Sequence, residues 1–411
     1  MNIGPTRRTL AWAAIVLAVL SAALFAFYQR DLARVFHVIH LFDRDEIVHN
    51  FRSMDTLFNS TPVLRGPAVH RLERRRGDLP LTYEYNGSTR TVANFLEETW
   101  TTGLVALQDG AIVYESYFLG NTAATKTISW SLAKSFVSAL VGIAVEEGRI
   151  RDIRQPVSDY VPALRGSGYD GVAIKDVLQM SSGVRFSEDY GDYFSDINRM
   201  GRAIAFNTSL DEFVASLQRE RPPGTFHHYA SVDTQVLGMV LHAATGRTVA
   251  SYLESRIWRK IGMESDAYWL VDRNGMELAF GGLNAVLRDY ARFGQLYLNE
   301  GSWAGEQVVP RAWVRASVTP DASHLQPGNP HSSWVLGYGY QWWIPQQPDG
   351  DYLAIGIHNQ FIYVYPKKKI VIAKSSAYPN YNTDGPDKEL ETIAVFREIA
   401  RHLTTPGPGR D

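Results

Sequence analysis

Segments that predict β-strands lie at opposite ends of the globular part of this 411-residue chain. Near its start, residues 104–107 and 112–114 flank Asp109-Gly110, a pair suited to the positive φ angles of a tight hairpin turn. Near its end, three apolar segments predict antiparallel strands, at residues 353–355, 361–364 and 370–373. Helical patterns lie between the two groups. The arrangement predicts an α+β fold with one antiparallel sheet assembled from both chain ends, flanked by helices and by an all-helical region.

The most apolar helical pattern of the globular part runs from Ser131 to Glu147. Its apolar residues recur at helical spacing, and Gly148 follows as a stop signal. We therefore expect a buried helix at this place. Further helices are predicted over residues 174–180, 234–244, 249–261 and 284–298.

The N-terminal region contains an uncharged, mostly apolar stretch of nineteen residues, from Leu10 to Tyr28, with arginines on both sides. That length fits a helix crossing a hydrocarbon core of about 30 Å. The apolar region of a cleaved signal peptide is usually shorter, about 7 to 15 residues. We expect an uncleaved, single-pass membrane anchor with the N-terminus inside and the globular domain outside, periplasmic or extracellular. A cleaved secretion signal is the alternative.

Composition and pattern divide the chain into five parts. The predicted parts are a cytoplasmic stub (residues 1–9), a transmembrane anchor (10–28), a stalk or linker that packs partly on the domain (29–94), one globular domain (95–403) and a disordered tail rich in Pro and Gly (404–411).

The composition excludes several classes of function. The chain has no cysteine, so disulfides, thiolate nucleophiles and Cys-ligated zinc are excluded. The formal net charge is -2, and apart from the run Arg71–Arg76 the basic residues are scattered, so nucleic acid is not an expected partner. No Gly-x-Ser-x-Gly elbow, P-loop or His-Glu-x-x-His motif occurs, and the spacing of His227-His228 does not suit one metal on one helix face. We expect no metal and no cofactor.

Ser131 and Lys134 lie three residues apart at the start of the predicted buried helix, so their side chains fall on one face within reach of each other. A hydroxyl becomes a strong nucleophile when a base removes its proton, and a desolvated lysine can lose its own proton to become that base. Partial positive charge at the helix N-terminus would stabilise an oxyanion formed on acylation. The same spacing also fits a capping serine beside an exposed lysine, so other motifs must decide between the two interpretations.

A second motif stands ninety-eight residues after Ser131, where Tyr229-Ala230-Ser231 precedes a predicted helix. Ser-x-x-Lys followed by such an element resembles the serine β-lactamase and penicillin-binding protein superfamily, which has Tyr-x-Asn or Ser-x-Asn there. The class C and esterase branch uses Tyr at that place. Residues 174–183 and 281–294 are similar to that branch's segment ending in Thr-Ser-Gly and to its Gly-Gly-Leu and helix element. The resemblance covers roughly residues 95–400 and implies the β-lactamase-like, or transpeptidase, fold.

The resemblance also implies roles for individual residues. Ser131 would be the nucleophile, Lys134 its proton partner, and Tyr229 the residue that takes the serine proton and returns it to the leaving group. The position of the Asn in the second element is Ser231 here, as in the branch that contains 6-aminohexanoate-dimer hydrolase. Because the Asn binds the β-lactam side-chain amide in the superfamily, its absence argues against antibiotic hydrolysis.

Four further residues complete the predicted site. Tyr190 is similar to a loop tyrosine of the same branch and would hydrogen-bond the leaving amine; a surface tyrosine is the alternative. The family's third element, Lys-Thr-Gly on a strand, is not evident here. A backbone N–H of Ile357 or of Gln360 is predicted to complete an oxyanion hole with that of the nucleophile. His358 either orients a substrate carboxylate or packs.

These residues predict a serine hydrolase that cleaves a small amide or ester through an acyl-enzyme on Ser131. One alternative is a D-amino-acid peptidase or carboxypeptidase acting on cell-wall peptides, which the outward topology would suit. Another is a membrane-anchored binding module of the same fold without turnover. The three catalytic residues argue against the binding module, and the missing third element argues for it.

Overall fold

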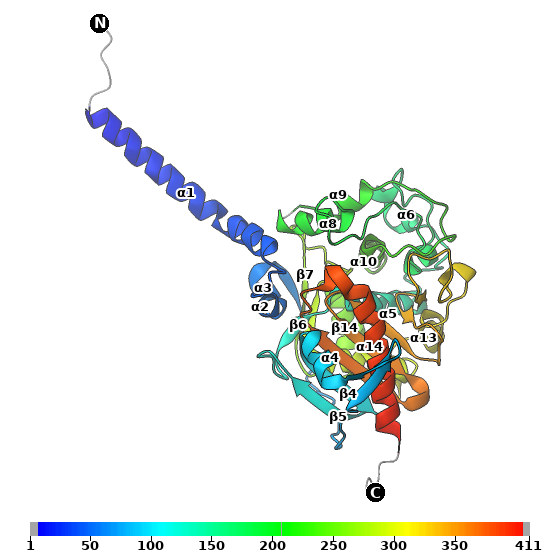
Figure 1. The fold of residues 1–411 in the computed structure, drawn as a ribbon. Coiled ribbons are helices and arrows are strands. Elements are labelled where there is room, and N and C mark those ends of the chain that lie inside the picture. Colours follow the sequence, from blue (N-terminus) through cyan, green and yellow to red (C-terminus); the bar gives the residue numbers. More distant parts are fainter. Residues whose placement is uncertain (1–6, 207, 406–411) are drawn as a thin grey trace.

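The computed structural model describes residues 7–206 and 208–405. Within that part of the chain, the main sheet has seven antiparallel strands in the order β11-β12-β13-β14-β15-β4-β5. At its centre Ile372 of β15 lies opposite Ala106 of β4, so the predicted sheet built from both chain ends is confirmed (Figure 1). Its strands are β4 (Thr101–Gln108), β5 (Ala111–Tyr117), β11 (Gly337–Tyr338), β12 (Trp343–Ile344), β13 (Tyr352–Gly356), β14 (Gln360–Tyr365) and β15 (Ile370–Ser376).

The turn between β4 and β5 has the predicted conformation. Asp109 and Gly110 both have positive φ, of 48° and 77°. Such a turn matches the right-handed twist of the strands that it joins, and glycine adopts the second angle without steric cost. The predicted hairpin at the start of the sheet is therefore confirmed.

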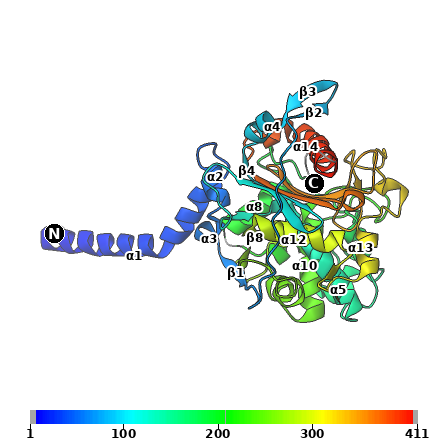
Figure 2. The same ribbon diagram turned by 90° about the horizontal axis from the view of Figure 1, so that it is seen from below.

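Helices cover both faces of the main sheet (Figure 2). Phe361 of β14 contacts Phe396 of α14 (Tyr381–Thr404) with ring centroids 5.5 Å apart. The next residue, Ile362, points to the opposite face, toward α12 (Leu287–Leu298), because side chains alternate along a strand. Gly294 lets α12 approach closely, since a Cβ at that position would lie 2.8 Å from Ile362. Burial on both faces explains why β14 after Gln360 and the first four residues of β15 carry apolar or aromatic side chains.

The predicted buried helix is α5 (Ala133–Glu146), which ends before Gly148 with φ of 67°. A short 3-10 turn, η1 (Trp130–Leu132), precedes it, and Trp130 itself has φ of 45°. A positive φ is costly for a residue with a Cβ and is found mainly where the surroundings enforce it. Here the turn carries Ser131 at the end of the helix nearest the sheet.

One helix boundary was predicted wrongly. Residues 284–286, expected to open a helix, belong to the strand β8 (Leu283–Val286), and α12 begins only at Leu287. The reason is pairing: Asn284 lies opposite both Ile128 of β6 (Lys126–Ile128) and Tyr268 of β7 (Ala267–Leu270). The spacing of apolar residues along the sequence does not reveal that neighbouring strands pair with a segment on both sides.

The other helical segments agree in kind with the sequence patterns. The predicted helices correspond to α7 (Ile174–Leu178), α10 (Ser231–Thr245) and α11 (Val249–Leu253), which continues as the π-helical turn η3 (Glu254–Trp258). Gly246 ends α10 in the left-handed conformation, as expected of a helix stop. The remaining helices of the domain are α4 (Val92–Glu98), α6 (Val157–Tyr160), α8 (Asp196–Ala205), α9 (Leu210–Ala215) and α13 (Arg311–Ser317), with 3-10 turns η2 (Pro162–Leu164), η4 (Ser323–Leu325) and η5 (Pro366–Lys368).

The segment between residues 29 and 94 contributes elements that pack on the rest. Strand β1 (Ser60–Val63) pairs with β7, so that β1, β7, β8 and β6 form a second antiparallel sheet. The other elements of this region are α2 (Ile47–Phe51), α3 (Met54–Leu57) and the hairpin β2 (Thr82–Tyr85) with β3 (Ser88–Thr91). Outside this region, the strands β9 (Ser302–Trp303) and β10 (Glu306–Gln307) form a short antiparallel pair.

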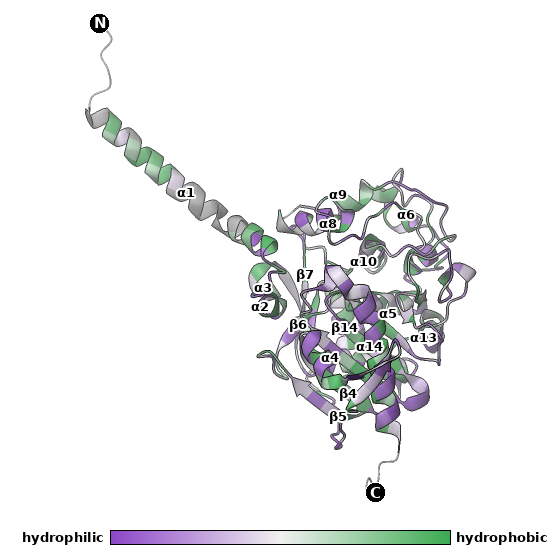
Figure 3. Ribbon diagram, in the orientation of Figure 1, coloured by the Kyte–Doolittle hydropathy of each residue, from purple (hydrophilic) through white to green (hydrophobic). Residues whose placement is uncertain are grey.

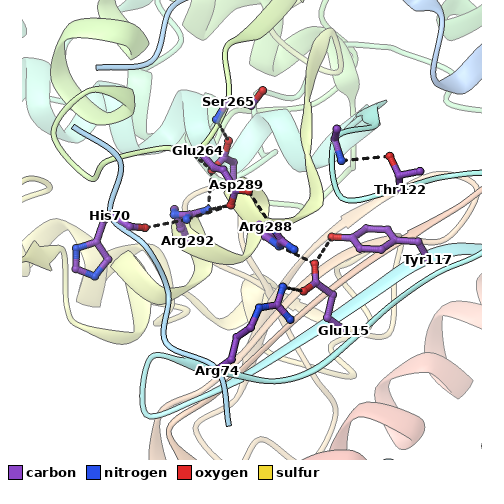
Figure 4. Close-up of polar contacts among 11 residues, drawn as sticks. His70, Arg74, Glu115, Tyr117, Thr122, Glu264, Ser265, Arg288, Asp289 and Arg292 are labelled. Atoms are coloured by element: carbon purple, nitrogen blue, oxygen red, sulfur yellow. Dashed lines mark hydrogen bonds and ion pairs between the residues drawn. The ribbon is translucent and has the colours of Figure 1, made fainter. Parts of the chain in front are cut away.

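A polar network fixes part of this segment to α12 (Figure 4). Arg292 is 1% exposed and donates to Asp289 Oδ1 at 2.9 Å and to the carbonyl of His70 at 2.8 Å. Arg288 donates to Glu115 Oε1 at 2.6 Å. Buried charges are tolerated when they are paired and hydrogen-bonded, and here the pairing ties residues near 70 to the domain.

The first helix, α1 (Arg7–Ile39), extends away from the body (Figure 1). Within the described part of the chain, no helix combines the length and the apolar character needed to cross a bilayer. This finding does not support the transmembrane anchor predicted over residues 10–28. The side chains of residues 22–32 lie outside the part of the chain that the structure describes. Residues 1–6 of the predicted stub and residues 406–411 of the predicted disordered tail also lie outside it.

Candidate active site

Ser131 and Lys134 meet at the start of α5, as their spacing predicts. Lys134 Nζ lies 2.6 Å from Ser131 Oγ, and both side chains are buried. The same amine donates to Ser231 Oγ at 3.0 Å and to the carbonyl of Phe280 at 2.9 Å. These contacts aim the Lys134 amine at the hydroxyl. An exposed lysine beside a capping serine, the alternative for this motif, does not describe the structure.

Burial changes the protonation of Lys134. Removal from water disfavours the charged amine and lowers its pKa to about 7, and the negative charge of Glu188 opposes part of that shift. A large fraction of the amine is therefore neutral near neutral pH. A neutral amine 2.6 Å from a hydroxyl is able to accept its proton.

Tyr229 lies across the site from α5, just before α10. Its ring lies beneath Lys134 Nζ, 5.0 Å from the centroid, and packs on Trp343 with centroids 5.2 Å apart. Burial raises the pKa of Tyr229 well above its ordinary value, and a hydrogen bond with Ser131 lowers it by a smaller amount. The phenol is therefore protonated in the free protein and has a proton to donate. The structure brings Ser131, Lys134 and Tyr229 together.

Glu188 is a member of the site that the sequence did not reveal. Its Oε1 accepts from Ser231 Oγ at 2.5 Å and from Tyr190 OH at 2.6 Å, and its Oε2 accepts from the backbone N–H of Ser231 at 2.9 Å. The carboxylate thus stands at the N-terminus of α10, where negative charge is favourable. A hydrogen-bonded chain runs from Lys134 through Ser231 and Glu188 to Tyr190.

The predicted oxyanion-hole candidates differ in their surroundings. Gly356, the last residue of β13, lies against the nucleophile turn, since a Cβ there would be 3.2 Å from Ser131 N. Ile357 follows and lines the cleft. Gln360 lies opposite Gly356 in the hairpin and donates from Nε2 to the carbonyl of Ser376 at 2.5 Å. Of the two candidates, Ile357 is the one beside Ser131 in the cleft.

His358 is not among the residues that line the cavities beside Ser131. Its Nδ1 bonds to the carbonyl of Tyr378 at 2.7 Å, and its ring stacks on Phe42 with centroids 4.9 Å apart. Burial lowers its pKa to about 4, so the ring is neutral near neutral pH. A neutral, stacked imidazole suits packing, the second of the two roles considered for it, and offers no charge to a carboxylate.

Two cavities meet at the nucleophile, and Ser131, Tyr190, Gly191 and Ile357 line both. We call the cavity of about 310 Å³ the polar cavity because two carboxyl groups, Glu188 and Glu389, line it together with Tyr229. The apolar cavity has a volume of about 510 Å³ and extends toward α1 and α8. Cavities of this size are typical of sites for small molecules.

Another carboxyl group that lines the polar cavity is buried, that of Glu389. Glu389 of α14 accepts from Tyr381 OH at 2.7 Å, and both residues line the cavity. Burial raises the pKa of Glu389 to about 7. Neither residue was predicted, because α14 enters the site only through its packing on the sheet.

Known proteins resemble this chain in sequence and in fold. The β-lactamase family model matches residues 89–395. The 6-aminohexanoate-dimer hydrolase of Paenarthrobacter ureafaciens is 32% identical over 297 residues, which cover 70% of this chain and 75% of that protein. The solved structure "Putative 6-aminohexanoate-dimer hydrolase from Bacillus anthracis" has a TM-score of 0.79 and 25% identity, covering 88% of this chain and 96% of that one. A penicillin-binding protein homologue from Caulobacter crescentus shares the fold, with a TM-score of 0.54 and 13% identity, covering 75% of this chain and 97% of that one.

The chain belongs to the β-lactamase family. It is a serine hydrolase related to 6-aminohexanoate-dimer hydrolases, and the resemblance predicted from its sequence is confirmed.

The charge of Glu188 provides a test of the protonation state of Lys134. We expect the neutral Lys134 amine to accept the proton of Ser131, so activity should fall as pH falls through the Lys134 pKa of about 7. Because the carboxylate raises that pKa, Glu188→Gln is expected to lower the pKa of Lys134 and to move the acidic limb to lower pH. The measurement is kcat/KM from pH 5 to 9, normalised to its plateau. Asp189→Asn, in the same cavity, is the matched control and leaves the limb in place; an unmoved limb in Glu188→Gln would contradict the assignment.

Proposed function

We propose that this protein hydrolyses a linear amide or ester through an acyl-enzyme on Ser131. The observation that supports it most directly is the distance of 2.6 Å between Lys134 Nζ and Ser131 Oγ, made by a buried amine whose pKa is about 7. The named relative acts, by its name, on the 6-aminohexanoate dimer, which is a linear amide.

In the first half-reaction Ser131 Oγ bonds to the substrate carbonyl carbon while its proton passes to Lys134 Nζ. The N–H groups of Ser131 and Ile357 stabilise the oxyanion. The bond from carbon to the leaving nitrogen or oxygen then breaks, and the Tyr229 phenol protonates the leaving group. Tyr229 regains a proton from the Lys134 ammonium, which is thereby neutral again.

In the second half-reaction water takes the place of the leaving group. Its oxygen attacks the acyl carbon while a proton passes to Lys134, and the bond to Ser131 Oγ breaks as the proton returns to that oxygen. The products are a carboxylic acid and the free enzyme. The chain from Ser231 through Glu188 to Tyr190 holds Lys134 in place during both halves, in agreement with the bonds described above.

A substrate panel tests the proposal. We expect p-nitrophenyl esters and short linear amides, including the 6-aminohexanoate dimer, to be hydrolysed at least about tenfold faster than a β-lactam, because Ser231 replaces the amide-binding Asn. Release of D-alanine from a muropeptide, without cleavage of the linear amides, would instead indicate a carboxypeptidase. Turnover of no substrate and no acyl adduct by intact mass spectrometry would contradict the proposed function altogether.

A further inference from the structure

The apolar cavity has walls from three separate parts of the chain. The end of α1, the helix α8 and the core around the nucleophile each contribute hydrocarbon side chains. Among the lining residues are Val38, Met54, Ile128, Ile197, Leu270 and Phe280. The end of α1 and the helix α8 contact each other beside the body of the domain (Figure 1).

Two polar side chains on the cavity wall, Asn198 and Arg202, make hydrogen bonds to backbone carbonyls. Asn198 Nδ2 donates to the carbonyls of Tyr190 at 3.1 Å and Asp192 at 2.8 Å. Arg202 donates from Nη1 to the carbonyl of Tyr193 at 2.5 Å, with its guanidinium 4.1 Å from the centroid of that ring. The wall that a ligand meets in this cavity is mainly hydrocarbon, which suits an aliphatic chain.

The entrance to the cavity is bordered by exposed apolar side chains. Ile39, Tyr193 and Phe206 line the cavity and are 68%, 64% and 60% exposed. Figure 3 shows hydrophobic residues where α1 meets the body. An exposed apolar patch of this kind marks a site of contact with an apolar ligand or surface, and its place here is the mouth of a cavity that ends at the nucleophile.

The position of Tyr229 indicates which cavity holds the leaving group of the substrate and which holds its acyl group. Tyr229, which protonates the leaving group in the proposed mechanism, lines the polar cavity and not the apolar one. The leaving group therefore lies in the polar cavity, near Glu188 and Glu389. The acyl group, on the other side of the same carbonyl carbon, lies in the apolar cavity.

We propose that the apolar cavity binds the aliphatic acyl chain of a medium-chain amide or ester. The inference rests on the proposed function, since the chain is the acyl group that Ser131 receives. It adds a substrate class, acyl groups with an extended, uncharged hydrocarbon chain, and assigns the end of α1 and α8 to the binding of that chain.

A chain-length series tests the site in the full-length protein. For p-nitrophenyl esters from acetate to decanoate, kcat/KM is expected to rise about threefold to fourfold per added methylene from butyrate to octanoate, which corresponds to about 0.8 kcal/mol for each methylene buried. A flat or falling series in a protein that hydrolyses the acetate ester would overturn the chain site while leaving the proposed function intact. No hydrolysis of any ester would be a failure of the proposed function.

Gly201→Leu narrows the cavity without disturbing the backbone. Gly201 lines the cavity, lies within α8, and a Cβ there would meet no atom within 4 Å. Leucine also has a higher helix propensity than glycine. The variant is expected to hydrolyse the acetate ester at the wild-type rate and to lose at least tenfold in kcat/KM on the octanoate ester. Equal losses on both esters would contradict the assignment.

A matched pair at the entrance gives a second variant. Phe206→Ser removes an exposed ring that lines the cavity, and Phe194→Ser removes an exposed ring of the same segment that does not. The octanoate preference is expected to fall in the first variant and to remain in the second.

Binding without turnover is measured on Ser131→Ala, where octanamide should bind at least tenfold more tightly than butanamide. Equal binding of the two amides would overturn the chain site even if the enzyme were inactive.

Discussion

Ser131→Ala is expected to lower kcat for every substrate by about 10⁴-fold or more, since losing the nucleophile of a hydrolase removes the covalent route entirely. The side chain is small and sits in the turn before α5, so its loss leaves the fold intact. A serine-directed fluorophosphonate should label the wild type and leave the variant unlabelled. The loss is measured with a p-nitrophenyl ester and, separately, by intact mass after incubation with the probe.

Ser138→Ala is the matched control for this variant. Ser138 is a buried serine of the same helix whose Oγ has no hydrogen-bond partner among the described residues. Its replacement is expected to leave both kcat and labelling unchanged. Equal labelling of Ser131→Ala and the wild type would show that another residue is the nucleophile.

The sequence predicted the parts of the site that depend on local spacing. Ser131 and Lys134 are three residues apart on one helix, so helix geometry alone brings their side chains together, and the structure places them 2.6 Å apart. Tyr229 was found differently, through the resemblance to a family in which such a residue follows the Ser-x-x-Lys helix. Its contact with Lys134 joins residues far apart in the chain.

Glu188 and Glu389 could not be predicted in the same way. Glu188 reaches Ser231 across 43 residues, through a loop whose path is set by packing rather than by any periodic pattern. Glu389 reaches the cleft because α14 lies on the sheet. Nothing in the residue types distinguishes these two from the chain's surface glutamates, since only the fold places them at the site.

The fold was predictable for a related reason. The central strands from the two chain ends contain continuous apolar segments, a property visible in the sequence, and such segments are typical of a sheet buried on both sides. The start of α12 was predicted wrongly because residues 284–286 are held in a strand by partners on both sides. A local sequence pattern predicts the structure of a segment where residues close in sequence determine that structure. It fails where pairing with residues far away in the sequence determines it.

Lys134→Met is expected to lower kcat by about 10³-fold, within the range for loss of a general base. Methionine has a similar length and flexibility and fills the same space without an amine. The limb of the pH profile near 7, which reflects titration of Lys134, should vanish with it. The measurement is kcat and kcat/KM for an amide and an ester from pH 5 to 9.

Stability separates the catalytic role of Lys134 from a structural one. In the unfolded chain this lysine has an ordinary pKa of 10.5, and in the fold the pKa is about 7, so the unfolded state binds more protons between these two pH values. The buried amine therefore destabilises the fold increasingly as pH falls from 10.5 to 7, and the full cost remains at lower pH. Lys134→Met removes that cost, and its Tm at pH 7 is expected to equal or exceed that of the wild type. A merely structural lysine would lower Tm when removed.

Lys374→Met is the matched control, because Lys374 is also fully buried with a pKa that burial lowers well below its ordinary value. Its amine binds Ser376 on β15, within the main sheet. Its replacement is expected to leave kcat within about threefold of the wild type and the limb near pH 7 in place. If both lysine variants lost activity alike, or if Lys134→Met retained the limb, the proton acceptor of Ser131 would have to be sought elsewhere, with Tyr229 the next group in contact with it.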